Sequence, residues 1–368
     1  MNYIVAAHGL FSFFHKDGKL FWCKYNGNSW SDAKILFDDV AENFNICLLG
    51  EEISIFTRDN RGSVNRSFFN EKNTVTHTLI RDTSNASSFA ATPAEDGINL
   101  IYNLPIEGEA LHMLMSQNIK SNGAWGPARR IDTITSSQNP FSLIPITDKH
   151  FLLFYQTTGG LENRLGYREI YGDELGRYNI LHSTMNHFAD MSFLATKYAF
   201  HGVCAIKGIF GTRLVYRNKG EDGFSRGIAL TEGQNVGNIV IYMMDDKLHL
   251  MFELDGILYN GLPAEQANKW NFSAAQVQDI SPRRLTKAAY ISSHKKGFLS
   301  SQLLVDALRP WEIYMLSSHI LAPYTSHNHN IFPVLGDRIL TAAETETDYN
   351  NFFDNMEDEL WDIKNGHI

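Results

Sequence analysis

Short apolar segments, each followed by a turn signal, run through the first 330 residues of the chain. One stretch reads SFAATPA, GINLIYNL, ALHMLMSQ, WGPARRI, and a later one reads NIVIYMM, KLHLMFEL, GILYNGLP, WNFSAAQV. These segments are rich in β-branched and aromatic residues, and turn pairs such as Asp17-Gly18 and Asp255-Gly256 separate many of them. Apolar residues at helical spacing are nearly absent before residue 330. The pattern predicts an all-β domain.

The segments recur in sets of four. One anchor in the third segment of each set lies at Leu20, Val64, Leu111, Leu165, Leu214 and Leu258, with spacings of 44, 47, 54, 49 and 44 residues. A drifting period near 48 residues with four strands per unit is typical of β-propeller blades. With KAAYISS, GFLSSQLLV and WEIYMLSS as a seventh unit, residues 1–330 are predicted to form a seven-bladed β-propeller. NYIVAA either completes the last unit or is the inner strand of the first.

Residues 331–368 have a different character. Apolar residues at Tyr349, Phe353, Met356, Leu360 and Ile363 follow alternating four- and three-residue spacing, which predicts a short C-terminal amphipathic helix. From Asp337 onward there are nine acidic and two basic residues. The segment either lies on the flank of the propeller or begins a coiled coil that makes a homo-oligomer through residues 337–368.

Charge and cysteine content narrow the choice of partners. The net charge is -9, of which the acidic tail carries -7, so neither part is basic enough for nucleic acid. The sequence contains no run of about 18 or more apolar residues, so it predicts no membrane-spanning helix. Cys23, Cys47 and Cys204 are odd in number and lie in apolar stretches, which favours buried free thiols in a reducing compartment. With no secretory leader recognised, a cytoplasmic location is expected.

A motif of five residues, Arg-Leu-x-Tyr-Arg, occurs twice. It comprises Arg164, Leu165, Tyr167 and Arg168, and then Arg213, Leu214, Tyr216 and Arg217. On a strand, Leu and Tyr share the face that packs between blades, whereas the arginines share the other face. The arginines either pair with acids of adjacent blades or form a cationic patch for a carboxylate or phosphate ligand, because guanidinium groups match oxyanions.

Two further residue sets are candidates for metal binding and for stacking on a sugar. His319, His327 and His329 lie in SSHILAPYTSHNHN, and a His-x-His on a strand can bind a metal, although a polar loop is the simpler interpretation. No other cofactor is indicated. Trp30, Trp125 and Trp270 open the fourth strand of three units, where packing between blades is favoured over stacking on a sugar.

The units FSFFHKDGKLFWCKYNGNSWSDAKIL and SQNIKSNGAWGPARRI resemble blades of the sialidase-like superfamily and of fucose-binding propeller lectins. The resemblance implies a propeller fold and glycan recognition. The Ser-x-Asp-x-Gly-x-x-Trp turn of many sialidases is absent. The arginines Arg58, Arg61, Arg168 and Arg217 do not lie at matching blade positions near strand starts, as a sialidase site requires. The inner strands contain almost no carboxylates, so no catalytic residue is assigned.

The sequence therefore predicts a non-catalytic recognition or scaffolding propeller that binds a glycan or a protein partner. The candidate ligand-binding residues are those of the repeated motif: Arg164, Tyr167, Arg168, Arg213, Tyr216 and Arg217. The alternatives are a sialidase-like carbohydrate-active enzyme and a propeller head on a coiled-coil rod.

Overall fold

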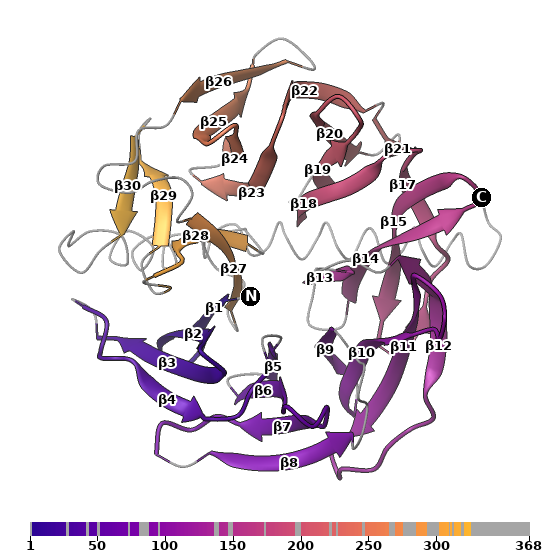
Figure 1. The fold of residues 1–368 in the computed structure, drawn as a ribbon. Helices are drawn as coiled ribbons and strands as arrows, with labels where there is room; N and C mark the ends of the chain where they lie inside the picture. Colours follow the sequence, from indigo (N-terminus) through magenta and orange to yellow (C-terminus); the bar gives the residue numbers. More distant parts are fainter. Residues whose placement is uncertain are drawn as a thin grey trace.

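The computed structural model describes residues 2–324 with short gaps, of which the longest are 81–87, 275–284 and 293–301. Within this part the chain forms strands only, arranged as sheets around a central axis (Figure 1). The prediction of an all-β propeller is confirmed. The predicted C-terminal helix, its coiled coil and the boundary at residue 330 lie outside the described residues.

Six sheets make up the propeller, and we number these blades in chain order. Blade 1 contains β1 (Asn2–Ala6), β2 (Leu10–Lys16), β3 (Lys19–Tyr25), β4 (Lys34–Phe37), β27 (Leu285–Ser292), β28 (Gln302–Asp306), β29 (Ile313–Ser317) and β30 (Ile320–Tyr324). Blade 2 contains β5 (Phe44–Leu49), β6 (Glu52–Arg58), β7 (Val64–Phe68) and β8 (Val75–Ile80). Blade 3 contains β9 (Phe89–Ala94), β10 (Gly97–Pro105), β11 (Leu111–Lys120) and β12 (Arg129–Thr135).

The other three blades follow the same antiparallel order from the axis outward. Blade 4 contains β13 (Phe141–Pro145), β14 (His150–Gly159), β15 (Glu162–Tyr171), β16 (Glu174–Leu175) and β17 (Asn179–Thr184). Blade 5 contains β18 (His187–Ala195), β19 (Phe200–Lys207), β20 (Thr212–Gly220), β21 (Gly223–Phe224) and β22 (Ile228–Gly233). Blade 6 contains β23 (Val236–Met244), β24 (Lys247–Leu254), β25 (Ile257–Pro263) and β26 (Trp270–Ala274).

The predicted count of seven blades is wrong. The strands expected as a seventh unit, β27–β30, belong to the sheet of the first, because β27 pairs in parallel with β1 from Asn2↔Ala288 to Ala6↔Ser292. On its other edge β1 pairs antiparallel with β2. The segment NYIVAA is therefore an inner strand and also the link between the first and last units, a double role that a repeat period does not reveal.

An outer-strand bulge recurs in five of the blades. Its third-strand residue is almost fully buried in each: Leu20, Val64, Leu114, Leu165 and Leu214. After each of these residues the register skips one residue of the outer strand: Leu36, Leu79, Ile131, Leu181 and Leu230. In the third unit the anchor is thus Leu114, and the predicted Leu111 is wrong by three positions. Bulges that recur at one position indicate a shared blade geometry.

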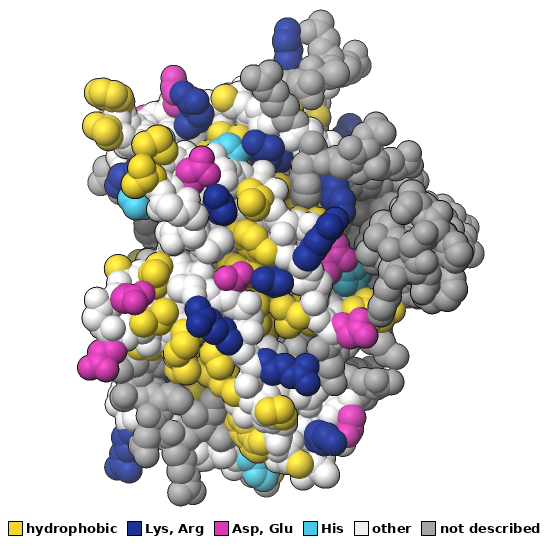
Figure 2. All heavy atoms as spheres, turned by 90° about the vertical axis from the view of Figure 1, so that its right-hand side faces the viewer, with side chains coloured by type: hydrophobic (Ala, Val, Ile, Leu, Met, Phe, Trp, Pro, Cys, Tyr) yellow, Lys and Arg dark blue, Asp and Glu magenta, His cyan; other side chains and the backbone are white. Residues whose placement is uncertain are grey.

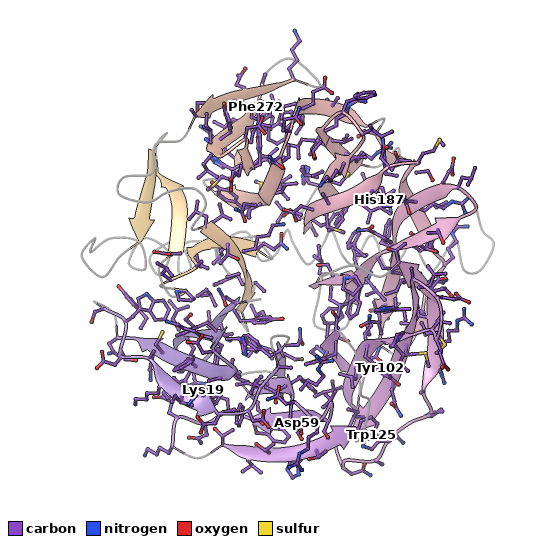
Figure 3. All side chains as sticks on the ribbon, viewed as in Figure 1. Lys19, Asp59, Tyr102, Trp125, His187 and Phe272 are labelled. Carbon is purple, nitrogen blue, oxygen red and sulfur yellow. The ribbon has the colours of Figure 1, made fainter. Side chains whose placement is uncertain are left out.

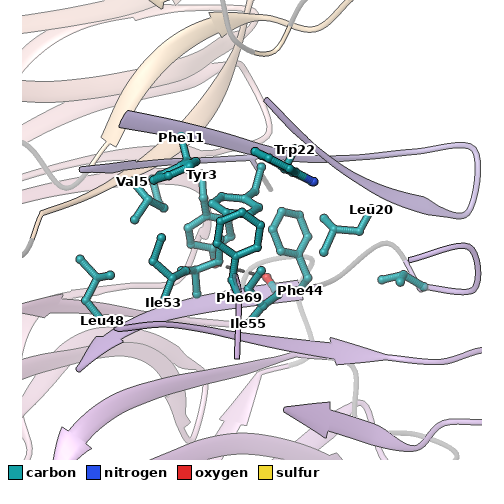
Figure 4. Packing of buried hydrophobic residues seen from close by; sticks show 14 residues of the cluster. Tyr3, Val5, Phe11, Leu20, Trp22, Phe44, Leu48, Ile53, Ile55 and Phe69 are labelled. Atoms are coloured by element: carbon teal, nitrogen blue, oxygen red, sulfur yellow. Dashed lines mark hydrogen bonds between the residues drawn. The ribbon is translucent and has the colours of Figure 1, made fainter. Parts of the chain in front are cut away.

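The hydrophobic cores lie between neighbouring blades. Between blades 1 and 2, the ring of Phe69 makes edge contacts with Phe11, Phe13 and Trp22 at centroid distances of 5.4, 5.0 and 5.1 Å (Figure 4). Between blades 4 and 5, Phe154 stacks on Phe193 at 3.8 Å. Aromatic pairs of this kind add to the free energy that burial of their area provides. Each blade is therefore stabilised mainly by its neighbours.

Candidate ligand-binding cleft between blades 4 and 5

The two Arg-Leu-x-Tyr-Arg segments occupy the same place in consecutive blades. The first lies on β15 and the second on β20, and the outer-strand bulge follows Leu165 in one and Leu214 in the other. Tyr167 and Tyr216 are buried, Tyr167 in the core between blades 4 and 5 and Tyr216 in the core between blades 5 and 6. As predicted, the Leu-x-Tyr face packs between blades, so neither tyrosine ring is available to a ligand in this structure.

Arg168 is locked into a network with the preceding blade. Its Nη2 lies 3.2 Å from Oδ2 of Asp132 on β12, its Nε donates to the hydroxyl of Tyr155 at 2.7 Å, and its Nη1 donates to the carbonyl of Gly176 at 2.9 Å. The Tyr155 hydroxyl also donates to Asp132 at 2.7 Å, and burial raises the pKa of this phenol. The positive charge of Arg168 is therefore neutralised by a carboxylate.

Arg217 has the same framework but a different partner. Its Nη1 donates to the carbonyl of Ser225 at 3.2 Å, which matches the contact between Arg168 and Gly176. Where Arg168 meets Asp132, Arg217 meets His182: its Nε and Nη2 lie 3.2 and 3.0 Å from Nδ1 of that imidazole. Asp132 and His182 are equivalent, since each pairs with the anchor leucine of its own blade, Leu114 or Leu165.

The imidazole does not neutralise the guanidinium. Burial, followed by the charge of Arg217, lowers the pKa of His182, so the ring is neutral and accepts at Nδ1. Burial also lowers the pKa of Arg217. Among the described residues, no carboxylate forms an ion pair with Arg217. Within the described part of the chain, this position holds a cation that no carboxylate balances.

Arg217 and His182 line a cleft of about 800 Å³ between β17 and the third and outer strands of blade 5. Arg213 and Glu232 form an exposed ion pair at its rim, with 3.5 Å between Nε and Oε2. The turn between β19 and β20 adds Ile209 and Phe210, each 93% exposed. Figure 2 shows this side of the molecule, where Lys and Arg side chains lie among hydrophobic ones. The cleft thus combines a partly buried cation, an exposed ion pair and an exposed aromatic ring.

The remaining predicted residues lie elsewhere or make other contacts. Arg164 lies 3.8 Å from Glu162 of its own strand and is outside the cleft. Trp270 packs edge-on against Tyr216 of the neighbouring blade, with 5.1 Å between the ring centroids. Trp125 is 37% exposed at the periphery of blade 3 (Figure 3). The contact of Trp270 supports packing between blades for that position.

The proposed metal ligands His319, His327 and His329 lie outside the described residues. Within the described part of the chain, no group of three or more His, Cys, Asp or Glu side chains is placed to hold a metal ion. Cys23, Cys47 and Cys204 are buried free thiols, as predicted, and burial raises the pKa of each. In the same described part, no helix is long and apolar enough to cross a bilayer.

Three polar residues with clear structural roles were not predicted from the sequence. Asp132 and His182 each follow the bulged apolar residue of an outer strand, so an alignment of fourth strands on this Leu or Ile would have found them. Asp190 lies on the inner strand β18, and its carboxylate accepts from Lys287 on β27 and from the Ile239 amide on β23. Both of its oxygens are occupied by contacts that join blades.

Comparisons with known proteins found similar structures but no similar sequence. No family model matches the chain, and no curated protein matches it. A puromycin-hydrolysing peptidase of Mycobacterium tuberculosis has a similar structure over 88% of this chain and 52% of its own, with a TM-score of 0.51 and 11% identity.

Lectin and neuraminidase-like structures are also similar. The SapL1 lectin, solved with alpha methyl fucoside, matches 76% of this chain and 96% of its own with a TM-score of 0.45 and 9% identity. A subtype N11 neuraminidase-like protein of A/flat-faced bat/Peru/033/2010 (H18N11) matches 74% of this chain and 85% of its own with a TM-score of 0.38 and 11% identity. At these identities the likeness concerns the fold alone. The propeller fold that the resemblance in sequence implied is confirmed by the six sheets of the structure (Figure 1).

Proposed function

We propose that this protein is a non-catalytic recognition module that binds a glycan in the cleft between blades 4 and 5. The observation that carries the proposal is the guanidinium of Arg217, which lines a cleft of about 800 Å³ and has no carboxylate partner among the described residues. Three hydrogen bonds of this side chain are formed within the protein, to His182 and Ser225. A guanidinium carries five N–H donors, of which two have no partner among the described residues and can serve a ligand.

The other residues of the cleft fit the chemistry of a sugar. Sugar rings present hydroxyl groups at their edges and C–H groups on their faces. Phe210 and Ile209 provide exposed apolar surface for a C–H face, while Arg213 and Glu232 offer a donor and an acceptor for hydroxyls. This volume lies within the range of small-molecule sites, about 300–1,000 Å³.

The test is binding of the purified protein to a broad glycan array. We expect the native protein to bind specific glycans. Arg217→Ala and Phe210→Ala are each expected to reduce this binding by about tenfold or more, because each removes one wall of the site. Arg168→Ala is the matched control, since it removes the equivalent side chain of the neighbouring blade but lies outside the cleft. Signal that is lost in the Arg168 variant and kept in the Arg217 variant contradicts this assignment.

A protein partner is the second candidate, and the distribution of exposed apolar residues favours it. The five most exposed large hydrophobic side chains of the described chain all lie in turns: Leu161, Met185, Ile209, Phe210 and Leu308. These turns connect the second and third strands of a unit or one blade to the next, and because strands alternate in direction they open onto one face. Exposed apolar residues on a single face support a protein contact there.

This second candidate predicts that Ile209→Ser with Phe210→Ser abolishes capture of a partner while Ile35→Ser, on the outer edge strand β4, has no effect. The experiment is cross-linking of the intact protein in its native lysate, followed by identification of the species that only the double variant loses. A partner retained by the double variant places the contact elsewhere.

The three buried free thiols support a reducing compartment such as the cytoplasm as the place of function.

A further inference from the structure

Blades 4 and 5 hold an arginine at the same position, Arg168 and Arg217, but the partner of the guanidinium is charged in one blade and neutral in the other. In each blade the guanidinium donates to the carbonyl of the residue that follows a two-residue strand, Gly176 after β16 or Ser225 after β21. It also reaches the residue after the bulge in the preceding blade. That residue is Asp132 in one case and His182 in the other. The carbonyl contact and the strand register correspond, whereas Nε donates to the Tyr155 hydroxyl in blade 4 and to His182 in blade 5. The exchange of Asp for His therefore removes the carboxylate and changes the partner of one N–H group.

The consequence is a difference of one unit charge between equivalent positions. Asp132 accepts from Arg168 at 3.2 Å and from Tyr155 at 2.7 Å, which leaves that site neutral and its acceptor occupied. At the second site the neutral His182 accepts from Arg217 but adds no negative charge. The cleft contains one described carboxylate, that of Glu232, and it forms an ion pair with Arg213 at the rim instead of with Arg217. The two charges of the ion pair at the rim cancel, so the positive charge of Arg217 is the net charge of the described residues that line the cleft.

A partly buried cation without a counter-ion is costly, and an anionic ligand removes that cost. Hydrogen bonds between a guanidinium and a charged oxyanion are also stronger than those to a neutral hydroxyl. A neutral sugar would leave the charge of Arg217 unbalanced in the complex. A ligand with a carboxylate or sulfate would instead provide what Asp132 provides to Arg168.

We infer that His182 makes the cleft between blades 4 and 5 selective for a sugar that carries a negatively charged oxyanion group. This inference rests on the proposed function and adds the chemical class of the ligand. His182 acts through Arg217: as a neutral acceptor it holds the guanidinium in place and leaves its charge to the ligand. The ligand would stand in for the carboxylate that the neighbouring blade supplies from its own chain.

The experiment compares matched neutral and acidic probes on one protein. Titration calorimetry with galactose, galacturonic acid and galactose 6-sulfate is expected to show binding of the acidic probes about tenfold or more tighter than that of galactose. The two acidic probes distinguish a planar carboxylate from a tetrahedral sulfate. His182→Asp, which copies the arrangement of Asp132, is expected to abolish the preference, and His182→Asn, a neutral acceptor, to keep it. Melting temperatures of both variants report whether they fold.

Each outcome has a distinct meaning. Equal binding of galactose and the acidic probes, lost in Arg217→Ala, overturns the charge selectivity while the proposed function stands. Binding of no probe on this set or on the glycan array overturns both. A preference for acidic probes that persists in a folded His182→Asp variant shows that another cation selects the ligand and overturns the role of His182.

Discussion

Lys287 on β27 donates to Asp190 on β18, with 2.5 Å between Nζ and Oδ1, although 97 positions separate them in the chain. The ammonium also donates to the carbonyl of Met191 at 2.9 Å, and Oδ2 of Asp190 accepts from the amide of Ile239 on β23. Three inner strands, β18, β23 and β27, thus meet at one carboxylate. The pair joins blade 5 to the part of blade 1 that the end of the chain supplies, across the intervening blade 6.

Replacement of Lys287 by Met is expected to lower the free energy of unfolding by about 2 kcal/mol, because it leaves the partly buried carboxylate of Asp190 without its counter-charge. Urea denaturation measures the change. Lys19→Met is the control, since its ion pair with Asp38 is exposed and such pairs contribute about 0–1 kcal/mol. An equal effect of the two substitutions would show that the contact between Asp190 and Lys287 does not stabilise the ring.

The two equivalent arginines are expected to differ in their contribution to stability. Arg168→Met leaves Asp132 without its cation and is expected to cost about 2 kcal/mol of unfolding free energy. Arg217→Met leaves only the neutral His182 and is expected to cost about 1 kcal/mol or less. Denaturation curves of both variants under one buffer condition test the difference. A larger loss for Arg217→Met contradicts the assignment of charge at the two sites.

His201 makes stability depend on pH. Burial lowers the pKa of this imidazole from the usual 6.5 to about 4, and its Nδ1 lies 2.8 Å from the hydroxyl of Tyr216. Because the unfolded chain takes up the proton first, the contribution of the neutral ring is present above about pH 6.5 and is lost as the pH falls to about 4, by roughly 2–3 kcal/mol.

The measurement for His201 is the unfolding free energy at pH 4.5 and pH 7 for the native protein and for His201→Gln. The difference between the two pH values is expected to shrink in the variant by most of that amount. An unchanged pH dependence would show that other groups, such as the carboxylates, account for acid destabilisation.

The acidic C-terminal segment is predicted to control association. If residues 337–368 begin a coiled coil, the mass in solution is a multiple of 41.7 kDa, and deletion of the segment reduces it to that of one chain. Light scattering coupled to size-exclusion chromatography measures both forms. A single-chain mass for the full protein would contradict the coiled coil and favour a helix on the propeller flank.

The period of the apolar segments was sufficient to predict an all-β propeller, because strand alternation, turn pairs and burial are local properties of the chain. The turn at Asp17-Gly18 has positive φ at both residues, 51° and 75°, as a two-residue hairpin turn requires. Likewise, the buried Leu-x-Tyr face follows from the two-residue period of a strand. These features depend on neighbours within a few residues.

The blade count and the polarity of the cleft depended on the tertiary structure. Whether β27 starts a new sheet or extends that of β1 is decided by pairing between residues about 286 positions apart, such as Asn2 and Ala288, and no local pattern encodes it. The repeated motif indicated two pairs of equivalent arginines, but within one pair Arg168 is neutralised by Asp132 whereas Arg217 faces His182. The charge of a site is a sum over residues that the fold brings together from different blades. The sequence alone therefore determined that the chain folds into β-propeller blades, whereas strand pairing and the packing of blades decided their number and which arginine lacks a carboxylate partner among the described residues.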